Sequence, residues 1–160
     1  MTRTLWRIAV DAPAYEAHDL SGKGAEITGG RWNVKGLPAV YASETRALAC
    51  LETMVHLNAG GLPLNRYLVQ IDVPPDVWAN AKVVTPDELP VGWDAEPPAK
   101  ASLDFASAWL KSKATALLVV PSMIIPEERN VLINPLHPDS AGVTATKVRK
   151  WLYDPRLSKA

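Results

Sequence analysis

Alternating apolar and polar positions predict five short strands along the chain. The clearest is 67–73, in which Tyr67, Val69, Ile71 and Val73 fall on one face and two prolines follow. The other four segments are shorter or more uniformly apolar, namely 5–10, 37–42, 116–120 and 129–134. Because these strands do not alternate regularly with helices, we expect an α+β fold and not a doubly wound parallel sheet.

Apolar residues at helical spacing predict three helices. The clearest begins after Ser43, a candidate N-cap, and continues to a glycine-containing stop at 58–61. A second covers 99–113, and a short third covers 145–152. In the first helix, Glu52 lies just beyond the edge of the apolar stripe, at the boundary of the core.

Two long segments show neither periodicity. Segment 11–30 is glycine-rich and polar, which predicts a loop, and loops of this length are usually functional or disordered. Segment 74–98 is rich in proline, which predicts irregular surface structure with at most one short helical turn. A binding or catalytic site is therefore sought first near the end of 11–30.

The composition is that of one globular domain over residues 1–160. Its 17 basic residues equal its 17 acidic residues, which argues against DNA binding by this chain alone, since such binding normally needs a strongly basic face. Cys50 is the single cysteine, so we assign it to packing and expect a reducing, cytoplasmic setting. The N-terminus does not resemble a signal peptide, and the apolar run 114–120 is far shorter than the roughly 20 residues that span a bilayer.

Four side chains are suited to binding a nucleotide. Arg31 follows two glycines, and its guanidinium can bind a phosphate with two hydrogen bonds. Trp32 and Tyr41 can stack on a flat ring, although single aromatic residues next to strands more often belong to the core or to sheet packing. Glu52 can stabilise an oxocarbenium ion or bind a ribose hydroxyl. Taken singly, Gly-Gly-Arg favours a surface turn with an incidental arginine, and a glutamate on an amphipathic helix is usually a solvated carboxylate.

The remaining candidates are weaker. His56 lies four residues after Glu52, so the two can touch on a helix, but such pairs are common. Ser122 lacks the Gly-x-Ser-x-Gly pattern of a hydrolase nucleophile, which favours a strand-end hydroxyl that binds a ligand or caps a turn. The three histidines lack metal-ligand spacing, so no metal site is expected. The glycine patterns of the usual phosphate-binding loops are also absent.

Four blocks of the sequence, taken together and in order, resemble the RES domain family, which is named for its Arg, Glu and Ser. The resemblance runs from Leu5 to Pro135, and its blocks are Gly29-Gly30-Arg31-Trp32-Asn33, Val40-Tyr41-Ala42-Ser43, 51–57, and Val120-Pro121-Ser122 with 130–137. It implies a single RES domain with a fold similar to that of bacterial ADP-ribosyltransferase toxins, built on a mixed or antiparallel sheet with flanking helices. It also implies the toxin of a type II toxin–antitoxin pair, with NAD+ as substrate and no metal.

The resemblance further implies roles for individual residues. Arg31 would hold the NAD+ phosphates, Tyr41 would stack near the nicotinamide, and Glu52 would orient the nicotinamide ribose. Ser122 would complete the floor of the pocket. Further candidate pocket residues, with less definite roles, are Trp32, Asn134 and His56. The implied partner is an antitoxin similar to Xre-type helix-turn-helix proteins, which would supply the contact with DNA.

Three reactions share the cleavage of the nicotinamide–ribose bond. ADP-ribose can pass to a protein side chain, to water or to phosphate, and the sequence favours the protein acceptor only slightly. A catalytically silent module that binds a nucleotide or a partner through the same cleft is the alternative from a different functional class. Loss of turnover with retained ligand affinity on substitution of Glu52 would distinguish an enzyme from such a module.

Overall fold

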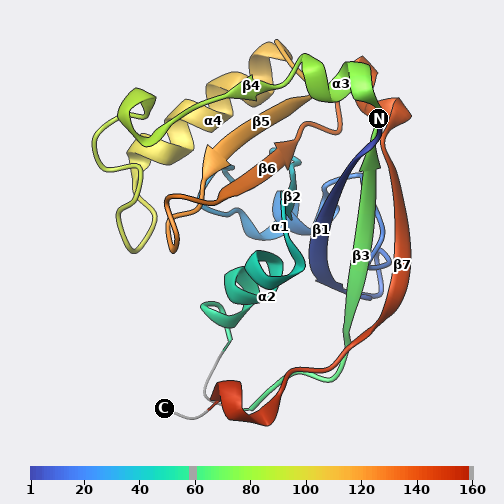
Figure 1. Cartoon of the computed structure of the whole chain (residues 1–160). Coiled ribbons are helices and arrows are strands. Elements are labelled where there is room, and N and C mark those ends of the chain that lie inside the picture. Colours follow the sequence, from blue (N-terminus) through green and yellow to red (C-terminus); the bar gives the residue numbers. More distant parts are fainter. Residues whose placement is uncertain (58–60, 159–160) are drawn as a thin grey trace.

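Seven strands form one sheet in the order β4-β5-β6-β2-β1-β3-β7 in the computed structural model, which describes residues 1–57 and 61–158 (Figure 1). Neighbouring strands are antiparallel except β4 and β5, which are parallel. The chain is therefore α+β, as predicted. The strands are β1 (Arg3–Val10), β2 (Val40–Ser43), β3 (Arg66–Val73), β4 (Lys82–Val83), β5 (Leu117–Pro121), β6 (Arg129–Ile133) and β7 (Thr144–Trp151).

The sheet consists of two halves that meet between β1 and β2. These two strands share a single paired position, Trp6 with Ser43, whereas β1 and β3 pair along their whole length. Figure 1 shows the strands of the two halves running at a wide angle to each other. Trp6, Ser43 and Asn130 are successive cross-strand partners, so their side chains point to the same face.

That face is covered by the two longer helices, α2 (Arg46–Met54) and α4 (Lys100–Ser112). Helix α4 buries Ala106, Trp109 and Leu110 against β5 and β6, which confirms the predicted helix over 99–113. Helix α2 buries Ala49 against the other half of the sheet. The opposite face of the sheet is packed by the segment after β1 and by α3 (Pro75–Ala79). The space where the two halves meet is thus flanked by α2 on one side and α4 on the other.

The predicted N-cap of the first helix is wrong by two residues. Ser43 is the last residue of β2, and its hydroxyl is used in a contact across the sheet. Thr45 caps α2 instead, because its side chain accepts a hydrogen bond from the backbone of Leu48 at 3.0 Å. The helix ends at Met54, and of the predicted stop at 58–61 positions 58–60 lie outside the described residues.

The predicted C-terminal helix over 145–152 is wrong, because this segment forms β7. Its side chains alternate between partly buried and exposed through the first half of the strand, and it pairs with β3 along an edge of the sheet. The apolar spacing of Val148, Trp151 and Leu152 suggested a helix. Alternating β-branched residues, Thr144, Thr146 and Val148, favour a strand and were the stronger signal.

Both segments predicted as irregular contain short regular elements. Segment 11–30 includes α1 (Lys23–Thr28), which has no buried residue. Segment 74–98 includes α3, β4 and the 3₁₀ turn η1 (Pro86–Glu88), and its Trp93 is buried in the core beneath α4. Two further 3₁₀ turns follow later, η2 (Pro138–Gly142) and η3 (Pro155–Ser158). Across the residues described, no helix is long and apolar enough to cross a membrane.

Candidate active site

The carboxylate of Glu52, in the last turn of α2, is held by two hydrogen-bond donors, one from the turn after β5 and one from β6. Ser122 Oγ donates to Glu52 Oε1 at 2.8 Å, and Asn130 Nδ2 donates to the same oxygen at 2.6 Å. Ser122 and Asn130 lie 70 and 78 residues further along the chain, so only the folded sheet brings these groups together. A carboxylate fixed by two donors has a defined orientation and keeps its second oxygen available for a substrate.

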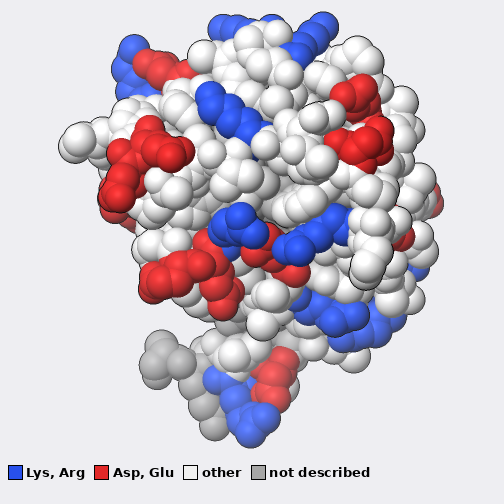
Figure 2. Space-filling view, turned by 45° about the horizontal axis from the view of Figure 1, so that its top comes forward, with Lys and Arg blue, Asp and Glu red and all other residues white. Residues whose placement is uncertain are grey.

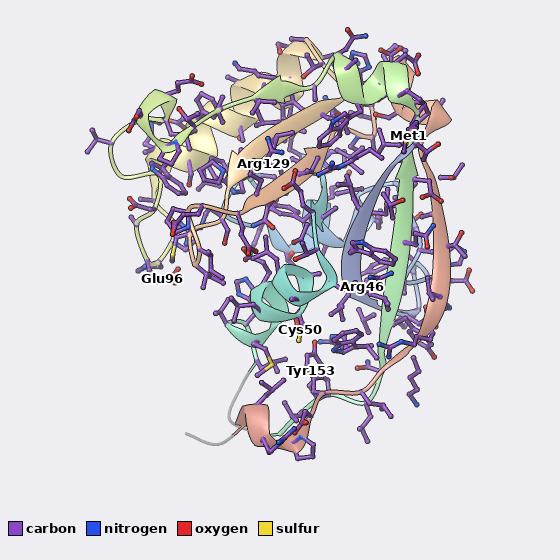
Figure 3. All side chains as sticks on the ribbon, in the orientation of Figure 1. Met1, Arg46, Cys50, Glu96, Arg129 and Tyr153 are labelled. Atoms are coloured by element: carbon purple, nitrogen blue, oxygen red, sulfur yellow. The ribbon has the colours of Figure 1, made fainter. Side chains whose placement is uncertain are left out.

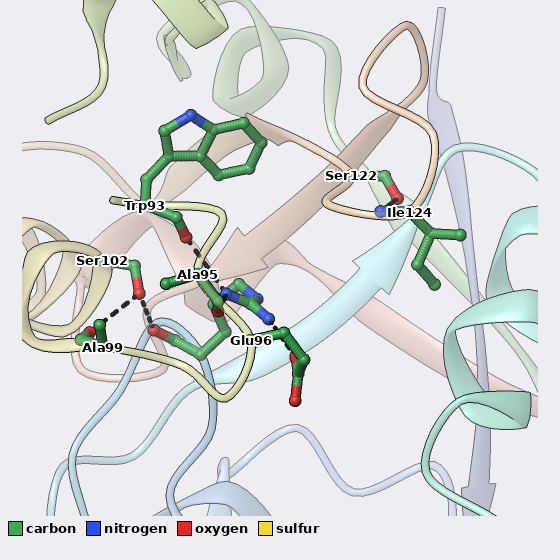
Figure 4. A network of polar contacts seen from close by, with 8 residues as sticks. Trp93, Ala95, Glu96, Ala99, Ser102, Ser122 and Ile124 are labelled. Atoms are coloured by element: carbon green, nitrogen blue, oxygen red, sulfur yellow. Dashed lines mark hydrogen bonds and ion pairs between the residues drawn. The ribbon is translucent and has the colours of Figure 1, made fainter. Parts of the chain in front are cut away.

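Ser122 is positioned by the turn that follows β5. Its side chain is fully buried, and its oxygen accepts hydrogen bonds from the backbone of Ile124 at 3.1 Å and of Ile125 at 3.2 Å (Figure 4). Because a hydroxyl carries one proton and accepts through its lone pairs, these two contacts direct the proton of Ser122 toward Glu52. The structure therefore joins two residues that the sequence analysis selected independently.

Arg31 is held by a different segment of the chain. Its Nη1 donates to the carbonyl oxygens of Trp93 at 3.2 Å and Ala95 at 2.7 Å, and its Nη2 forms an ion pair with Glu96 Oε2 at 2.8 Å (Figure 4). The Arg31 side chain is 14% exposed and that of Glu96 is 65% exposed. The described contacts do not join Arg31 to Glu52, and the partner of its guanidinium is a carboxylate from segment 93–96.

Tyr41 and Trp32 connect β2 with the loop that carries Arg31. The Tyr41 hydroxyl donates to Asn33 Oδ1 at 2.6 Å and accepts from the backbone of Trp32 at 3.1 Å. Burial raises the pKa of Tyr41 well above its usual value, so the phenol stays neutral. A side chain at Gly30 would place its Cβ 2.7 Å from that hydroxyl, so position 30 requires glycine. Trp32 is itself 3% exposed.

The indole of Trp32 lies in the core and does not face an open cleft. It stacks on Trp93 with ring centroids 6.1 Å apart and an interplanar angle of 21°. Trp93 belongs to the segment whose carbonyl accepts from Arg31. The stack therefore fixes the Arg31 loop against segment 93–96, which gives Trp32 an indirect role in placing the guanidinium.

Asn134 and His56 are not brought to Glu52. Asn134 follows β6 at the end away from Asn130, about 13 Å along the strand. Its side chain donates to the carbonyl of Leu110 at 2.9 Å and accepts from the backbone of Leu136 at 3.1 Å. His56 is exposed beyond the end of α2. In the described part of the chain, neither residue contacts the Glu52 carboxylate.

The sequence analysis did not select Asn130, Ser43 or Arg7 as candidate site residues. Asn130 and Ser43 point inward from strands that are otherwise apolar, and a polar residue at such a position was the available signal. Arg7 shares a face of β1 with Leu5 and Ala9, opposite to the face of Glu52, and burial lowers its pKa. The inward positions of strands thus held chemical information that motif spacing did not reveal.

Charged residues surround the start of α2. The carboxylate of Glu44 bridges Arg3 at 2.8 Å and Arg129 at 2.7 Å, and the guanidinium of Arg46 lies 3.7 Å from the centre of the Trp6 ring (Figure 3). Figure 2 shows acidic and basic groups interspersed on the face it displays, with no large region of one sign. Among residues 1–57 and 61–158, no group of His, Cys, Asp and Glu is arranged to hold a metal ion.

The end of α2 is fixed by the C-terminal segment. The hydroxyls of Thr53 and Tyr153 lie 2.7 Å apart, and the partly buried Cys50 packs with Trp151 (Figure 3). Burial raises the pKa of the Cys50 thiol, which keeps it in its unreactive neutral form. The packing with Trp151 and the raised thiol pKa favour the predicted packing role of Cys50. Together with the Thr53–Tyr153 contact, this packing anchors the helix turn that carries Glu52.

The model of the RES domain family matches residues 4–155, nearly the whole chain. This chain belongs to the RES domain family. A protein of Sphingobium sp. (strain YBL2), named "Prs ADP-ribosylating toxin", is 66% identical over 157 residues, which cover 98% of each chain. Proteins named "Toxin Res" are 34% identical in Yersinia enterocolitica, over 89% of this chain and 93% of that one, and 36% identical in Pseudomonas putida, over 96% and 98%.

Membership of the RES domain family confirms the resemblance that the ordered sequence blocks suggested. In this RES domain, Glu52 and Ser122 are in direct contact, whereas Arg31 lies in a separate cluster with segment 93–96. The two clusters are joined through β2, in which Tyr41 binds the backbone of Trp32, next to Arg31, and Ser43 binds Asn130, a partner of Glu52.

Proposed function

We propose that this RES domain is a toxin that cleaves NAD+ at the nicotinamide–ribose bond and transfers ADP-ribose to a protein acceptor. The observation that carries the proposal is the Glu52 carboxylate, fixed through Oε1 by Ser122 and Asn130. Support for transfer to protein comes from the relative that is 66% identical and is named as an ADP-ribosylating toxin. We also propose the ADP-ribosyltransferase-like fold that the family resemblance implies.

Glu52 acts on the charge that develops during cleavage. Nicotinamide leaves with the electron pair of the bond to the ribose anomeric carbon, so positive charge builds on the ribose. A carboxylate beside the ribose stabilises that charge, and an oxygen of Glu52 also accepts a hydrogen bond from a ribose hydroxyl. The acceptor nucleophile then bonds to the anomeric carbon and loses its proton to solvent. Two fixed donors keep Glu52 in position through these steps.

Arg31 and Tyr41 bind the rest of the dinucleotide. The planar guanidinium of Arg31 matches the geometry of a phosphate, and the NAD+ pyrophosphate takes the place of the Glu96 carboxylate. The ring of Tyr41 stacks near the nicotinamide, and its hydroxyl, engaged with Asn33 and Trp32, fixes the ring plane. Ser122 serves the site by holding Glu52. Asn134 and His56 remain pocket candidates from the family resemblance alone.

The toxin is proposed to work in the cytoplasm as half of a toxin–antitoxin pair. Relatives named "Toxin Res" support a toxic activity that the producing cell must restrain. The equal numbers of acidic and basic residues support DNA contact through the antitoxin, which we expect to be of the Xre type, and not through this chain. No metal takes part in the proposed reaction.

Nicotinamide release from NAD+ by the purified chain tests the proposal. Glu52→Gln keeps the size of the side chain and removes its charge, so release falls by about 100-fold or more. The control is Asp87→Asn, an exposed residue of η1 with the same change of charge, which retains wild-type release. Expression of the wild type, but not of Glu52→Gln, arrests bacterial growth.

The fate of ADP-ribose separates the possible reactions. With NAD+ labelled on the ADP-ribose part, purified Prs and a bacterial lysate are offered as acceptors, because the similar toxin is named for Prs. Label on a protein supports the transferase. Release of nicotinamide with free ADP-ribose, or with its phosphate ester when phosphate is added, replaces the transferase with an NAD+-degrading toxin. Absence of release under all conditions contradicts the proposal and favours a binding module.

A further inference from the structure

The side-chain amide of Asn130 lies between Ser43 and Glu52. Ser43 Oγ donates to Asn130 Oδ1 at 2.6 Å, and Asn130 Nδ2 donates to Glu52 Oε1 at 2.6 Å. Ser43 and Asn130 are direct cross-strand partners on β2 and β6. The three groups therefore form a chain of hydrogen bonds that leads from the sheet to the carboxylate.

The Glu52 carboxylate, which only accepts, determines which way the amide faces, and Ser43 supports that orientation. An amide rotated by 180° would point its carbonyl oxygen at the Glu52 carboxylate, with two acceptors facing each other and no proton between them. The hydroxyl of Ser43 donates its single proton to the Asn130 oxygen, which leaves the NH₂ group directed at Glu52. Ser43 is 4% exposed, so water does not compete effectively for that proton.

The two donors to Glu52 come from supports of different kinds. Ser122 lies in a turn after β5, whereas Asn130 lies inside a strand that is paired on both sides. Groups on paired strands are more rigidly placed than groups on loops. Glu52 itself has a long side chain in the last turn of a nine-residue helix, so its own backbone does not fix the carboxylate.

We infer that Asn130 is a positioning residue for Glu52 and that Ser43, hydrogen-bonded to the amide oxygen, supports its orientation. The inference rests on the proposed function, since it concerns the same carboxylate. Asn130 and Ser122 together occupy Oε1, which presents Oε2 to the ribose. Asn130 touches neither the substrate nor the reacting atoms, and it acts only through Glu52.

A purely structural role makes a different prediction. If Asn130 only ties α2 to the sheet, its loss lowers stability and the concentration of folded enzyme, but each folded molecule retains its kcat. If Asn130 positions Glu52, kcat falls in molecules that remain folded, and KM for NAD+ changes little because the phosphate and ring contacts lie elsewhere. Outer partners of reactive groups typically contribute about 10–100-fold.

Asn130→Asp gives a signature that a structural role does not. Near neutral pH the introduced carboxyl is ionised and repels Glu52; at lower pH it is protonated and donates a hydrogen bond in the manner of the amide. The activity of Asn130→Asp relative to the wild type therefore rises as the pH falls from 8 to 5. Glu44 and Arg129, next to Ser43 and Asn130 in the chain, already form an ion pair with each other, and comparison with the wild type at each pH removes the effect of groups common to both proteins.

The experiment compares Asn130→Ala, Asn130→Asp and Ser43→Ala with Asn80→Ala, an exposed asparagine next to α3. Expected results are a kcat for Asn130→Ala that is about 10–100-fold lower, a KM within about twofold, and a smaller loss for Ser43→Ala. Thermal unfolding of each variant shows the folded fraction. The wild-type kcat in folded Asn130→Ala, or a relative activity of Asn130→Asp that does not rise toward pH 5, overturns the inference.

A second readout does not depend on activity. The carboxyl ¹³C chemical shift of Glu52 at pH 7 reports its hydrogen bonding directly, and it changes in Asn130→Ala but not in Asn80→Ala. If the wild type releases no nicotinamide, the proposed function fails, and this resonance still decides whether Asn130 controls the carboxylate. If the wild type is active and neither kcat nor the resonance responds to Asn130, the inference fails alone.

Discussion

At the scale of single residues, the site depends on hydroxyl groups whose proton has one possible direction. Ser122 and Ser43 each direct a proton along the chain that ends at Glu52, and Tyr41 directs its proton to Asn33. In each case a neighbouring residue decides the direction, by accepting the proton or by occupying the lone pairs. The sequence revealed Tyr41, Glu52 and Ser122 as candidates, but hydrogen-bond direction depends on partners that are distant in the chain.

Tyr41→Phe removes two hydrogen bonds while it keeps the ring. The backbone N–H of Trp32 and the side-chain oxygen of Asn33 lose their phenol partner, which costs about 1–3 kcal/mol of unfolding free energy. Because burial raises the pKa of Tyr41, its phenol ionises above about pH 10 only in the unfolded chain. The wild type therefore loses stability above that pH, and the difference in unfolding free energy between the wild type and Tyr41→Phe becomes smaller. Urea unfolding at pH 7 and pH 10.5 measures both effects.

Tyr153→Phe provides the comparison for Tyr41→Phe. The Tyr153 hydroxyl contacts the side chain of Thr53 at the end of α2, away from the Arg31 loop. Its removal lowers stability without changing the affinity for NAD+. Equal stability of Tyr41→Phe and the wild type at pH 7 would show that the contacts with Trp32 and Asn33 contribute nothing.

At the scale of elements, local pattern predicted most strands and both longer helices, and it failed where two patterns competed. In β7 the helical spacing of a few apolar residues competed with alternating β-branched residues, and pairing with β3 decided the outcome. Segment 74–98 was expected to be irregular surface, yet Trp93 is buried and Glu96 reaches Arg31. Proline content indicates where regular structure ends, but it contains no information on tertiary contacts of this kind.

Glu96→Gln is expected to lower KM for NAD+. The Glu96 carboxylate occupies the guanidinium that we assign to the NAD+ phosphates, so binding must exchange one anion for the other. An exposed ion pair contributes about 0.2–1 kcal/mol, which corresponds to a decrease in KM of up to about fivefold, with kcat unchanged. Initial rates of nicotinamide release over a range of NAD+ concentrations measure this decrease.

Asp94→Asn is the matched control for Glu96→Gln. Asp94 is exposed in the same segment and carries the same charge, and within the described residues it forms no ion pair. Asp94→Asn leaves KM unchanged. If the loss of any negative charge from this segment lowered KM, both variants would show the decrease. A KM that rises in Glu96→Gln would mean that Glu96 orders Arg31 for NAD+ and does not compete with it.

At the scale of the whole molecule, the sequence predicted the α+β class and the family but not the order of the strands. The order of the strands determines which segments become neighbours. It brings Glu52, Ser122 and Asn130 together from three separate segments. Only half of the consecutive strands are neighbours in the sheet: β2 and β3, β3 and β4, and β6 and β7 are each separated by other strands. Local periodicity does not indicate which residues pair across neighbouring strands. The contact of Asn130 with Glu52 is therefore apparent only in the folded chain.

An ion pair joins the segment after β1 to β7, and its contribution to the stability of the fold depends on pH. Lys147 Nζ in β7 lies 2.9 Å from Asp11 Oδ2, just after β1, and Asp11 Oδ1 accepts from the backbone of Ala17 at 2.7 Å. These bonds, from Lys147 first and Ala17 second, hold the pKa of Asp11 below its usual value. A carboxylate with a lowered pKa in the folded state stabilises the fold above its unfolded pKa of about 3.9 and loses that contribution as the pH falls through the folded pKa.

Asp11→Asn therefore lowers the Tm at pH 7, and the difference from the wild type decreases as the pH falls below about 4. Thermal unfolding followed by circular dichroism from pH 7 to pH 3 measures the difference, with the exposed Asp87→Asn as the control for a general change of charge. Since Lys147 retains its charge throughout, Lys147→Met reproduces the loss at pH 7, and the double variant loses less than the sum of the two. Additive losses would show that Asp11 and Lys147 do not stabilise the fold through their contact, and that strand pairing and packing hold β7 on β3 without it.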